Sequence, residues 1–200
     1  MDNYEILPED FQKYDLSFKI VILGDSGTGK SCFSNKAVGN SFIEDYNATE
    51  GFEFLALNIR INNSIIKLQI WDTCGTEAYK SLVANFYKNS SLAILVYSID
   101  NKESFQHIES WLNDFNQQVP NGRIFLVGNK SDLEESRKVS KDEGEKFTKE
   151  NKLNMFFETS AKSGENVQNV LIEAAKLLYS IFKNGFLEYE PYKIFKWKNY

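Results

Sequence analysis

The feature that most constrains this chain is the segment 24–31, Gly-Asp-Ser-Gly-Thr-Gly-Lys-Ser, which directly follows the mainly apolar run 18–23. An apolar run of this length is typical of a buried strand, so the segment is expected to connect that strand to a helix. Glycines allow the backbone to turn until successive N–H groups point at one spot, and the helix directs the positive end of its dipole to the same spot. The segment therefore favours a bound anion.

Lys30 and Ser31 indicate which anion this is. The Lys30 ammonium would reach the outer phosphates of a nucleoside triphosphate, and the Ser31 hydroxyl would ligate the Mg²⁺ that bridges them. The alternative is a glycine-rich turn that holds no ligand, and the strand before the segment disfavours it. We assign nucleotide contacts in this part of the chain to Ser26, Gly27, Thr28, Gly29, Lys30, Ser31 and Cys32.

The length and charge of the chain exclude several classes of protein. Two hundred residues suit one domain, and a net charge of −5 gives no overall attraction to nucleic acid or anionic lipid. Cys32 and Cys74 lie inside motifs rather than in a spaced pair, which indicates a reducing compartment. No apolar run approaches the ~20 residues that a membrane-spanning helix needs. We therefore expect a cytoplasmic protein with no transmembrane segment and no nucleic-acid partner.

The chain divides into an N-terminal arm (1–17), a main domain (18–183) and a C-terminal tail (184–200). A hairpin-turn signal at 62–64 separates two strands that should be antiparallel, and after them strands alternate with helices. Alternation predicts a mainly parallel sheet with helices on both faces and with ligands at the carboxyl ends of the strands. We expect strands at 18–23, 52–61, 65–72, 92–97, 123–127 and 155–157, and helices at 30–39, 105–115, from Ser140 onward and at 167–182.

A carboxylate, Asp72, ends the strand expected at 65–72. In a protein with a phosphate-binding loop, an aspartate in this place holds magnesium directly or through water. The alternative is an aspartate that caps a turn, and the glycine loop elsewhere in the chain disfavours it. We assign Asp72 to the metal, together with Ser31.

The segment 128–132, Gly-Asn-Lys-Ser-Asp, predicts which base is bound. The Asp132 carboxylate can accept hydrogen bonds from guanine N1–H and from the 2-amino group, whereas adenine would present its N1 lone pair there. A site of this kind discriminates by about 10⁴ or more. Lys130 can lie along the face of the base, and Asn129 would connect this loop to the phosphate loop. For the tetrapeptide taken alone, a solvated turn is the alternative.

A second segment expected at the base is 158–162, Glu-Thr-Ser-Ala-Lys, which follows the last strand. The Ala161 backbone N–H can donate to guanine O6. Ser160 and Lys162 complete the contacts that we assign to this segment, whose short motif is weak by itself.

Taken together, these motifs and their order resemble the Ras superfamily of small GTPases, and within it the Rab branch. The segments 24–32, 67–73 and 97–105 look like Rab sequence, and the resemblance extends from about Phe18 to Phe182. It implies an α/β fold of the P-loop NTPase class, the small-GTPase fold, with a six-stranded, mostly parallel sheet flanked by about five helices. It also implies GTP and GDP as ligands, Mg²⁺ as the metal, and a monomer.

The resemblance gives roles to several further residues. Thr49 matches the first-switch threonine that ligates magnesium only when the γ-phosphate is present, and Gly75 matches the glycine whose backbone N–H meets that phosphate. Phe42 matches the aromatic residue that packs against guanine, and Tyr46 matches the tyrosine that closes over the phosphates.

Three aromatic residues, Phe54, Trp71 and Phe86, match the trio that partner proteins contact in Rabs. The resemblance therefore implies effectors, an exchange factor and a GTPase-activating protein as partners. For Phe54 and Phe86 the alternative is plain packing in the core.

Thr76 stands where the family has the glutamine that orients the attacking water. Threonine is two carbons shorter and has no amide, so it cannot hold that water in line. The chain has three arginines, none of them in a switch loop: Arg60, Arg123 and Arg137. The family's intrinsic rate is already on the order of 10⁻⁴ s⁻¹ with its glutamine, so still slower hydrolysis is expected here. The residues assigned to catalysis are Lys30, Gly75 and Thr76.

We therefore expect a Rab-like guanine-nucleotide switch that hydrolyses GTP slowly and regulates vesicle trafficking through GTP-dependent effector binding. The alternative, which Thr76 favours, is a hydrolysis-deficient pseudo-GTPase that stays bound to GTP and serves as an interaction module. An ATP-dependent kinase or ATPase is a third possibility, and the segment 129–132 disfavours it.

The C-terminal part departs furthest from the family. Rabs end in cysteines that carry prenyl chains, and no cysteine follows Cys74. Either the natural end is missing, or membranes are reached only through partners, or they are not used; we expect no prenyl anchor and peripheral contact with endomembranes through partners. The aromatic and basic residues of 186–200 fit either a membrane interface or docking on protein. The only histidine, His107, receives no role.

Overall fold

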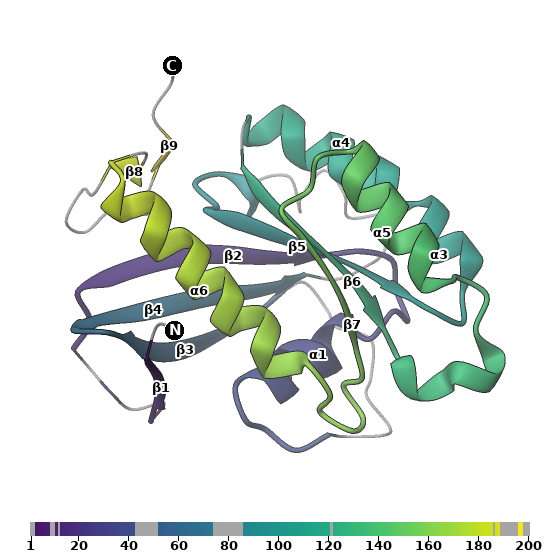
Figure 1. Cartoon of the computed structure of the whole chain (residues 1–200), viewed down its shortest axis with the longest axis horizontal. Helices are drawn as coiled ribbons and strands as arrows, with labels where there is room; N and C mark the ends of the chain where they lie inside the picture. Colours follow the sequence, from purple (N-terminus) through teal and green to yellow (C-terminus); the bar gives the residue numbers. More distant parts are fainter. Residues whose placement is uncertain are drawn as a thin grey trace.

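The computed structural model describes residues 3–8, 11, 13–42, 52–73, 86–120, 122–185, 187–188 and 196–197. Its centre is a seven-stranded sheet in the order β1-β3-β4-β2-β5-β6-β7 (Figure 1). The strands are β1 (Tyr4–Leu7), β2 (Leu16–Leu23), β3 (Phe52–Ile61), β4 (Ser64–Thr73), β5 (Leu92–Ser98), β6 (Arg123–Asn129) and β7 (Met155–Thr159). Strands β4, β2, β5, β6 and β7 are parallel, and β3 is antiparallel to both of its neighbours. The mostly parallel α/β sheet predicted from the sequence is confirmed.

The strand count is the point where the sequence was wrong, because seven strands are present in place of six. The additional strand, β1, lies in the arm 1–17 and pairs with β3, with Tyr4 opposite Ile61 and Leu7 opposite Asn58. Its segment has no period that a sequence can show, since only Leu7 is buried. What makes it a strand is the unpaired edge of β3, whose backbone groups need partners.

Helices cover both faces of the sheet, as expected (Figure 1). The described part has five α-helices: α1 (Lys30–Ala37), α3 (Lys102–Gln106), α4 (Ile108–Gln118), α5 (Lys141–Glu150) and α6 (Val167–Lys183). The helix predicted at 105–115 is two helices, α3 and α4, which meet at His107. The helix predicted from Ser140 begins with a capping box between Ser140 and Glu143.

Two hydrophobic cores result, one on each face of the sheet. Strand β2 shows the division, since Phe18, Ile20 and Ile22 pack with α1 and α6, while Val21 and Leu23 pack with α4. Because successive residues of a strand point to opposite faces, an apolar run without alternation is what a strand covered on both faces requires. The continuous run 18–23 is thus explained by burial on two sides.

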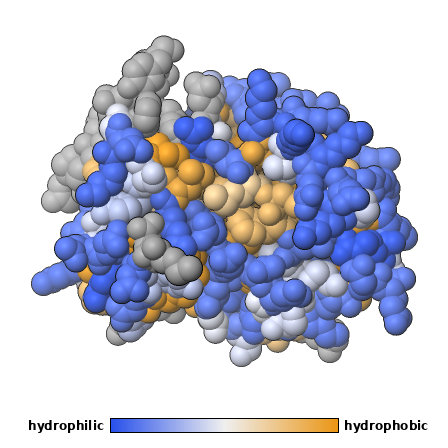
Figure 2. Space-filling model, in the orientation of Figure 1, coloured by the Kyte–Doolittle hydropathy of each residue, from blue (hydrophilic) through white to orange (hydrophobic). Residues whose placement is uncertain are grey.

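The surface and the helices of the described residues bear on whether the chain could cross a membrane. In the face shown in Figure 2 most of the surface is hydrophilic, and the hydrophobic surface gathers near the middle of the view. Within the described ranges, no helix combines the length and the apolar character that crossing a bilayer demands. A short antiparallel pair, β8 (Leu187–Glu188) with β9 (Lys196–Trp197), follows α6.

Lys19 is a charged residue inside this sheet. It belongs to β2 and is only 5% exposed. Its ammonium donates to the Lys88 carbonyl at 3.2 Å and lies 4.6 Å from the centre of the Trp71 ring. Burial lowers the pKa of Lys19 from 10.5 to about 8, because the charged form loses hydration that these contacts do not fully replace.

We predict that Lys19→Met stabilises the protein at pH 7 by about 2 kcal/mol, since it removes a poorly hydrated charge and keeps an apolar stem. Between pH 8 and 10.5 the unfolded chain holds the Lys19 proton more tightly than the folded one, so the wild type gains stability as the pH rises. The advantage of the variant should therefore shrink across this window. Urea unfolding of both proteins at pH 7, 8.5 and 10 measures it, and an advantage independent of pH would contradict the prediction.

Candidate nucleotide site

The glycine-rich loop lies between β2 and α1, at the carboxyl edge of the parallel strands. Gly24 has a φ of 143°, and a Cβ there would lie 2.1 Å from the Val96 carbonyl oxygen of β5. Gly29 has a φ of 85°, and a Cβ there would lie 2.6 Å from the Asn129 amide nitrogen. Only glycine permits both the left-handed backbone and these close approaches, which hold the loop against the ends of β5 and β6.

Within the loop, polar groups converge on the Asp25 backbone carbonyl. It accepts hydrogen bonds from Thr28 Oγ1 at 2.9 Å and from Lys30 Nζ at 2.8 Å. Thr28 and Lys30 are buried, whereas Ser26 and Gly27 are exposed at the loop's turn. Helix α1 begins after Gly29 without a side-chain cap and without an acidic residue in its first turn, so the positive end of its dipole meets no negative side chain in that turn.

Ser31 and Asp72 meet beside this loop. The Ser31 hydroxyl donates to Asp72 Oδ2, and Asp72 Oδ1 is buried with no hydrogen-bond partner in the part of the chain that the structure describes. Burial raises the pKa of Asp72 to about 6, against the opposing effects of the Ser31 hydrogen bond and the Lys30 charge. A hydroxyl beside a carboxylate with one unsatisfied oxygen is a hard donor pair that fits Mg²⁺.

Cys32 follows in α1 as a half-buried free thiol. Burial, and to a lesser degree the Asp72 charge, raises the pKa of this thiol, so it stays protonated and behaves as a packing residue.

Asn129, at the end of β6, connects three segments of the site. Its Nδ2 donates to the Thr28 carbonyl of the phosphate loop at 2.9 Å, which is the contact expected from the sequence. Its Oδ1 accepts from Thr159 Oγ1 at 3.2 Å and from the Ala161 backbone N–H at 3.3 Å. The Ala161 N–H that the sequence assigned to guanine O6 thus contacts Asn129 in this structure. Since Asn129 is completely buried, it determines how far apart these loops lie.

The two segments expected at the base also meet each other. Asp132 lies in the 3-10 helix η2 (Ser131–Ser136), and its Oδ1 accepts from the Ser160 hydroxyl at 2.5 Å. Lys130 has a left-handed backbone, with a φ of 65°, which turns the chain sharply from β6 into η2. Ser160 is buried, and Lys162 is exposed one turn further on.

A family model described as the Ras family matches residues 19–180, most of the chain and all of the site just described. The chain belongs to the Ras family. A member of this family is a small GTPase, that is, a switch protein that binds GTP, and such proteins bind guanine nucleotides with Mg²⁺ in general.

Some assigned residues of this Ras-family chain lie outside the described residues. They are Tyr46, Thr49, Gly75 and Thr76. Phe42 is described, partly buried, and packs against the core between the sheet and helices α1 and α6.

The aromatic trio expected at the partner surface does come together, and it has a fourth member. Trp71 lies 5.5 Å from Phe54 and 5.7 Å from Phe86 between ring centres, and Phe52 lies 5.2 Å from Trp71 and 4.6 Å from Phe86. We call these four residues the aromatic cluster. Plain core packing does not describe it, since Phe52 and Phe54 are about half exposed. The sequence missed Phe52, although it stands two residues from Phe54 and so on the same face of β3.

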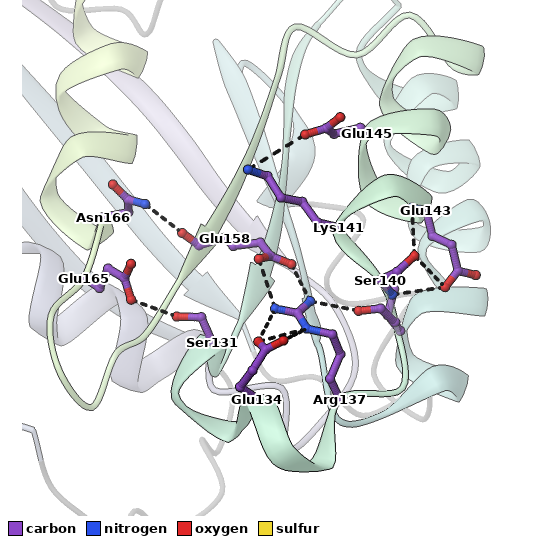
Figure 3. A network of polar contacts seen from close by, with 11 residues as sticks. Ser131, Glu134, Arg137, Ser140, Lys141, Glu143, Glu145, Glu158, Glu165 and Asn166 are labelled. Atoms are coloured by element: carbon purple, nitrogen blue, oxygen red, sulfur yellow. Dashed lines mark hydrogen bonds and ion pairs between the residues drawn. The ribbon is translucent and has the colours of Figure 1, made fainter.

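The sequence also missed Arg137, which joins the two segments expected at the base (Figure 3). Its guanidinium donates to both Glu158 oxygens, at 2.6 and 3.1 Å, and to the Glu134 carboxylate, at 2.7 Å for the shortest contact. It also donates to the Val139 carbonyl at 2.9 Å. Because Glu158 is the first residue of the segment 158–162 and Glu134 belongs to η2, Arg137 holds the two segments expected at the base in one arrangement.

We predict that Arg137→Met lowers the midpoint of thermal unfolding by about 5 °C, because it leaves the partly buried Glu158 carboxylate without its cation. The Glu158 side chain is 17% exposed, whereas that of Glu134 is 68% exposed. Glu134→Gln is therefore the matched control and should change the midpoint little. The double variant Arg137→Met with Glu158→Gln should recover most of the loss, and a double variant as unstable as the single one would contradict this explanation.

Proposed function

We propose that this Ras-family chain is a Rab-like molecular switch selective for guanine nucleotides, which hydrolyses GTP slowly to GDP. The observation that carries the proposal is the Asn129 side chain, which joins the phosphate loop at Thr28 to the Thr159 and Ala161 segment. One buried amide thereby holds the phosphate loop together with the two segments expected at the base, which supports a single nucleotide site. Ligand sites of open parallel sheets lie at this same carboxyl edge.

Guanine is the base that the side chains favour. Asp132 places a carboxylate beside Ser160, and a carboxylate can pair with the N1–H and 2-amino donors of guanine. The Lys130 side chain follows Asn129 and is proposed to cover the face of the base.

We predict that Asp132→Asn weakens GTP and GDP binding by roughly 100-fold, since a charged hydrogen-bond acceptor becomes a neutral amide. The same change should improve binding of xanthosine diphosphate, whose 2-oxo group accepts from the new amide N–H. Calorimetry of the wild type and the variant with GDP, ATP and xanthosine diphosphate measures this. An ATP affinity equal to that for GDP in the wild type would overturn the guanine-nucleotide proposal.

Magnesium and the γ-phosphate complete the proposed switch. Ser31 and Asp72 would hold the metal with Thr49, and the metal would balance the charge of the phosphates when bound. Lys30 is proposed to neutralise the outer phosphates, and Gly75 to donate its N–H to the γ-phosphate. Tyr46 and Phe42 are proposed to cover the phosphates and the base.

The Rab-like part of the proposal rests on the aromatic cluster. Exposed aromatic side chains that pack on one another offer a rigid surface with little conformational entropy to lose, which suits a protein partner. We propose that effectors, an exchange factor and a GTPase-activating protein contact this surface, and that the protein acts as a cytoplasmic monomer in vesicle trafficking, reaching endomembranes through partners.

The rate of hydrolysis separates this proposal from its main alternative, a pseudo-GTPase that stays bound to GTP. Thr76 favours slow hydrolysis in either case, because its short side chain cannot orient a water as a glutamine does. We predict that Thr76→Gln raises the single-turnover rate of GTP hydrolysis roughly 10- to 100-fold. Rapid quench with labelled GTP measures both proteins. Equal and measurable rates would contradict the role of Thr76, and no turnover by either protein would favour the pseudo-GTPase.

A further inference from the structure

Asp25, the second residue of the phosphate loop, contacts a helix far away in the sequence. Its Oδ2 lies 2.6 Å from His107 Nδ1, and its Oδ1 accepts from the Trp111 indole N–H at 2.8 Å. Each carboxylate oxygen thus has its own partner. We call these three residues the Asp25 clamp.

The other side of Asp25 faces the nucleotide machinery. Its backbone carbonyl is the group that accepts from Thr28 Oγ1 and from Lys30 Nζ. One residue therefore holds the proposed phosphate-binding lysine through its backbone while helix α4 holds its side chain. A shift of α4 against the sheet would be transmitted to the position of Lys30 through a single peptide unit.

Of the two side chains that contact Asp25, that of Trp111 is fixed by packing and that of His107 is accessible to solvent. Trp111 is completely buried in the core beneath α4, so its indole N–H is held by packing. His107 is the single residue between α3 and α4, its carbonyl accepts from the Ser110 and Trp111 backbone N–H groups, and its side chain is 40% exposed. The junction of α3 and α4 is thus a surface position that contacts the phosphate loop directly.

The negative charge of Asp25 explains why its side chain has to be held away from a bound phosphate. If the Asp25 carboxylate turned toward a bound phosphate, the energy of the bound state would rise, because like charges repel strongly in a partly buried site. Two donors from the α3–α4 region keep this carboxylate directed at α4. Loss of either donor frees the side chain to turn and leaves the loop less well ordered for its ligand.

We propose that the Asp25 clamp is a positioning device that sets how long the nucleotide stays bound, and that the α3–α4 junction is a second control point for nucleotide release, apart from the switch loops. His107 and Trp111 are positioning residues in this proposal, since they act through Asp25. The inference rests on the proposed binding of guanine nucleotides.

The test measures release of a fluorescent GDP analogue, chased with excess GDP at constant Mg²⁺, from the full chain and its variants. Trp111→Phe removes the indole N–H and keeps an aromatic ring, and His107→Leu removes the ring nitrogen at a half-exposed position. Each should raise the release rate about tenfold, the value of one hydrogen bond to a charged group. His107→Asn, whose amide can replace Nδ1, should stay within about threefold of the wild type. Gln106→Ala, an exposed neighbour in α3, is the control and should not change the rate.

The Asp25→Ala background separates a clamp from ordinary packing. There Trp111→Phe should add no further increase, because its partner is already gone. The Trp111 indole N–H resonance in a ¹⁵N spectrum should also move upfield in Asp25→Ala and stay in place in Gln106→Ala. Circular dichroism shows whether each variant is folded. If Trp111→Phe does not fold, His107→Leu still tests the proposal.

The outcomes are distinguishable. A wild type that does not retain the GDP analogue overturns the proposed nucleotide binding and the clamp with it. A wild type that retains the analogue, with His107→Leu and Trp111→Phe releasing it at the wild-type rate, overturns the clamp alone. An effect of Trp111→Phe that is equally large in the Asp25→Ala background overturns it as well.

Discussion

The hydrogen bonds of one buried amide, Asn129, hold the candidate site together. The phosphate loop follows β2, and the two segments expected at the base follow β6 and β7. The carboxyl ends of these three strands must therefore lie at the same level along the sheet. Sheet pairing brings these strand ends to one edge, but it does not say how their loops lie. The Asn129 side chain does so, because its donor and its acceptor are both used and neither has access to water. Because the loops share hydrogen bonds to this one amide, a change in the position of one loop affects the positions of the others.

Three aspartates near this edge have three different surroundings. Asp72 is buried, and loss of hydration raises its pKa. Asp132 pairs with one hydroxyl from the neighbouring segment. Asp25 is held by two donors from the α3–α4 region, directed at α4. The residue type is the same in each case, and the local partners differ in the way that the three proposed tasks require: binding a metal, recognising a base and positioning a loop.

Much of the fold could be predicted because it depends on local patterns. The run 18–23 predicts a buried strand, the turn at 62–64 predicts a hairpin, and the order of strands and helices predicts a mostly parallel sheet. The positions of Lys30, Ser31, Asn129 and Asp132 could be predicted because the ends of parallel strands meet at one edge. Strand β1 could not, because its residues show no alternation and it forms only against the free edge of β3.

By itself, the sequence determined the class of fold and the family, and it predicted which residue types face a phosphate and a base, since all of these follow from short motifs and their spacing. Only the tertiary structure decided that His107 and Trp111 contact Asp25, that Arg137 joins Glu134 to Glu158, and that Phe52 joins the aromatic cluster. The reason is physical. Such contacts join polar or aromatic tips of side chains from different elements, and their geometry depends on how whole helices and strands pack, which no local pattern of residues encodes.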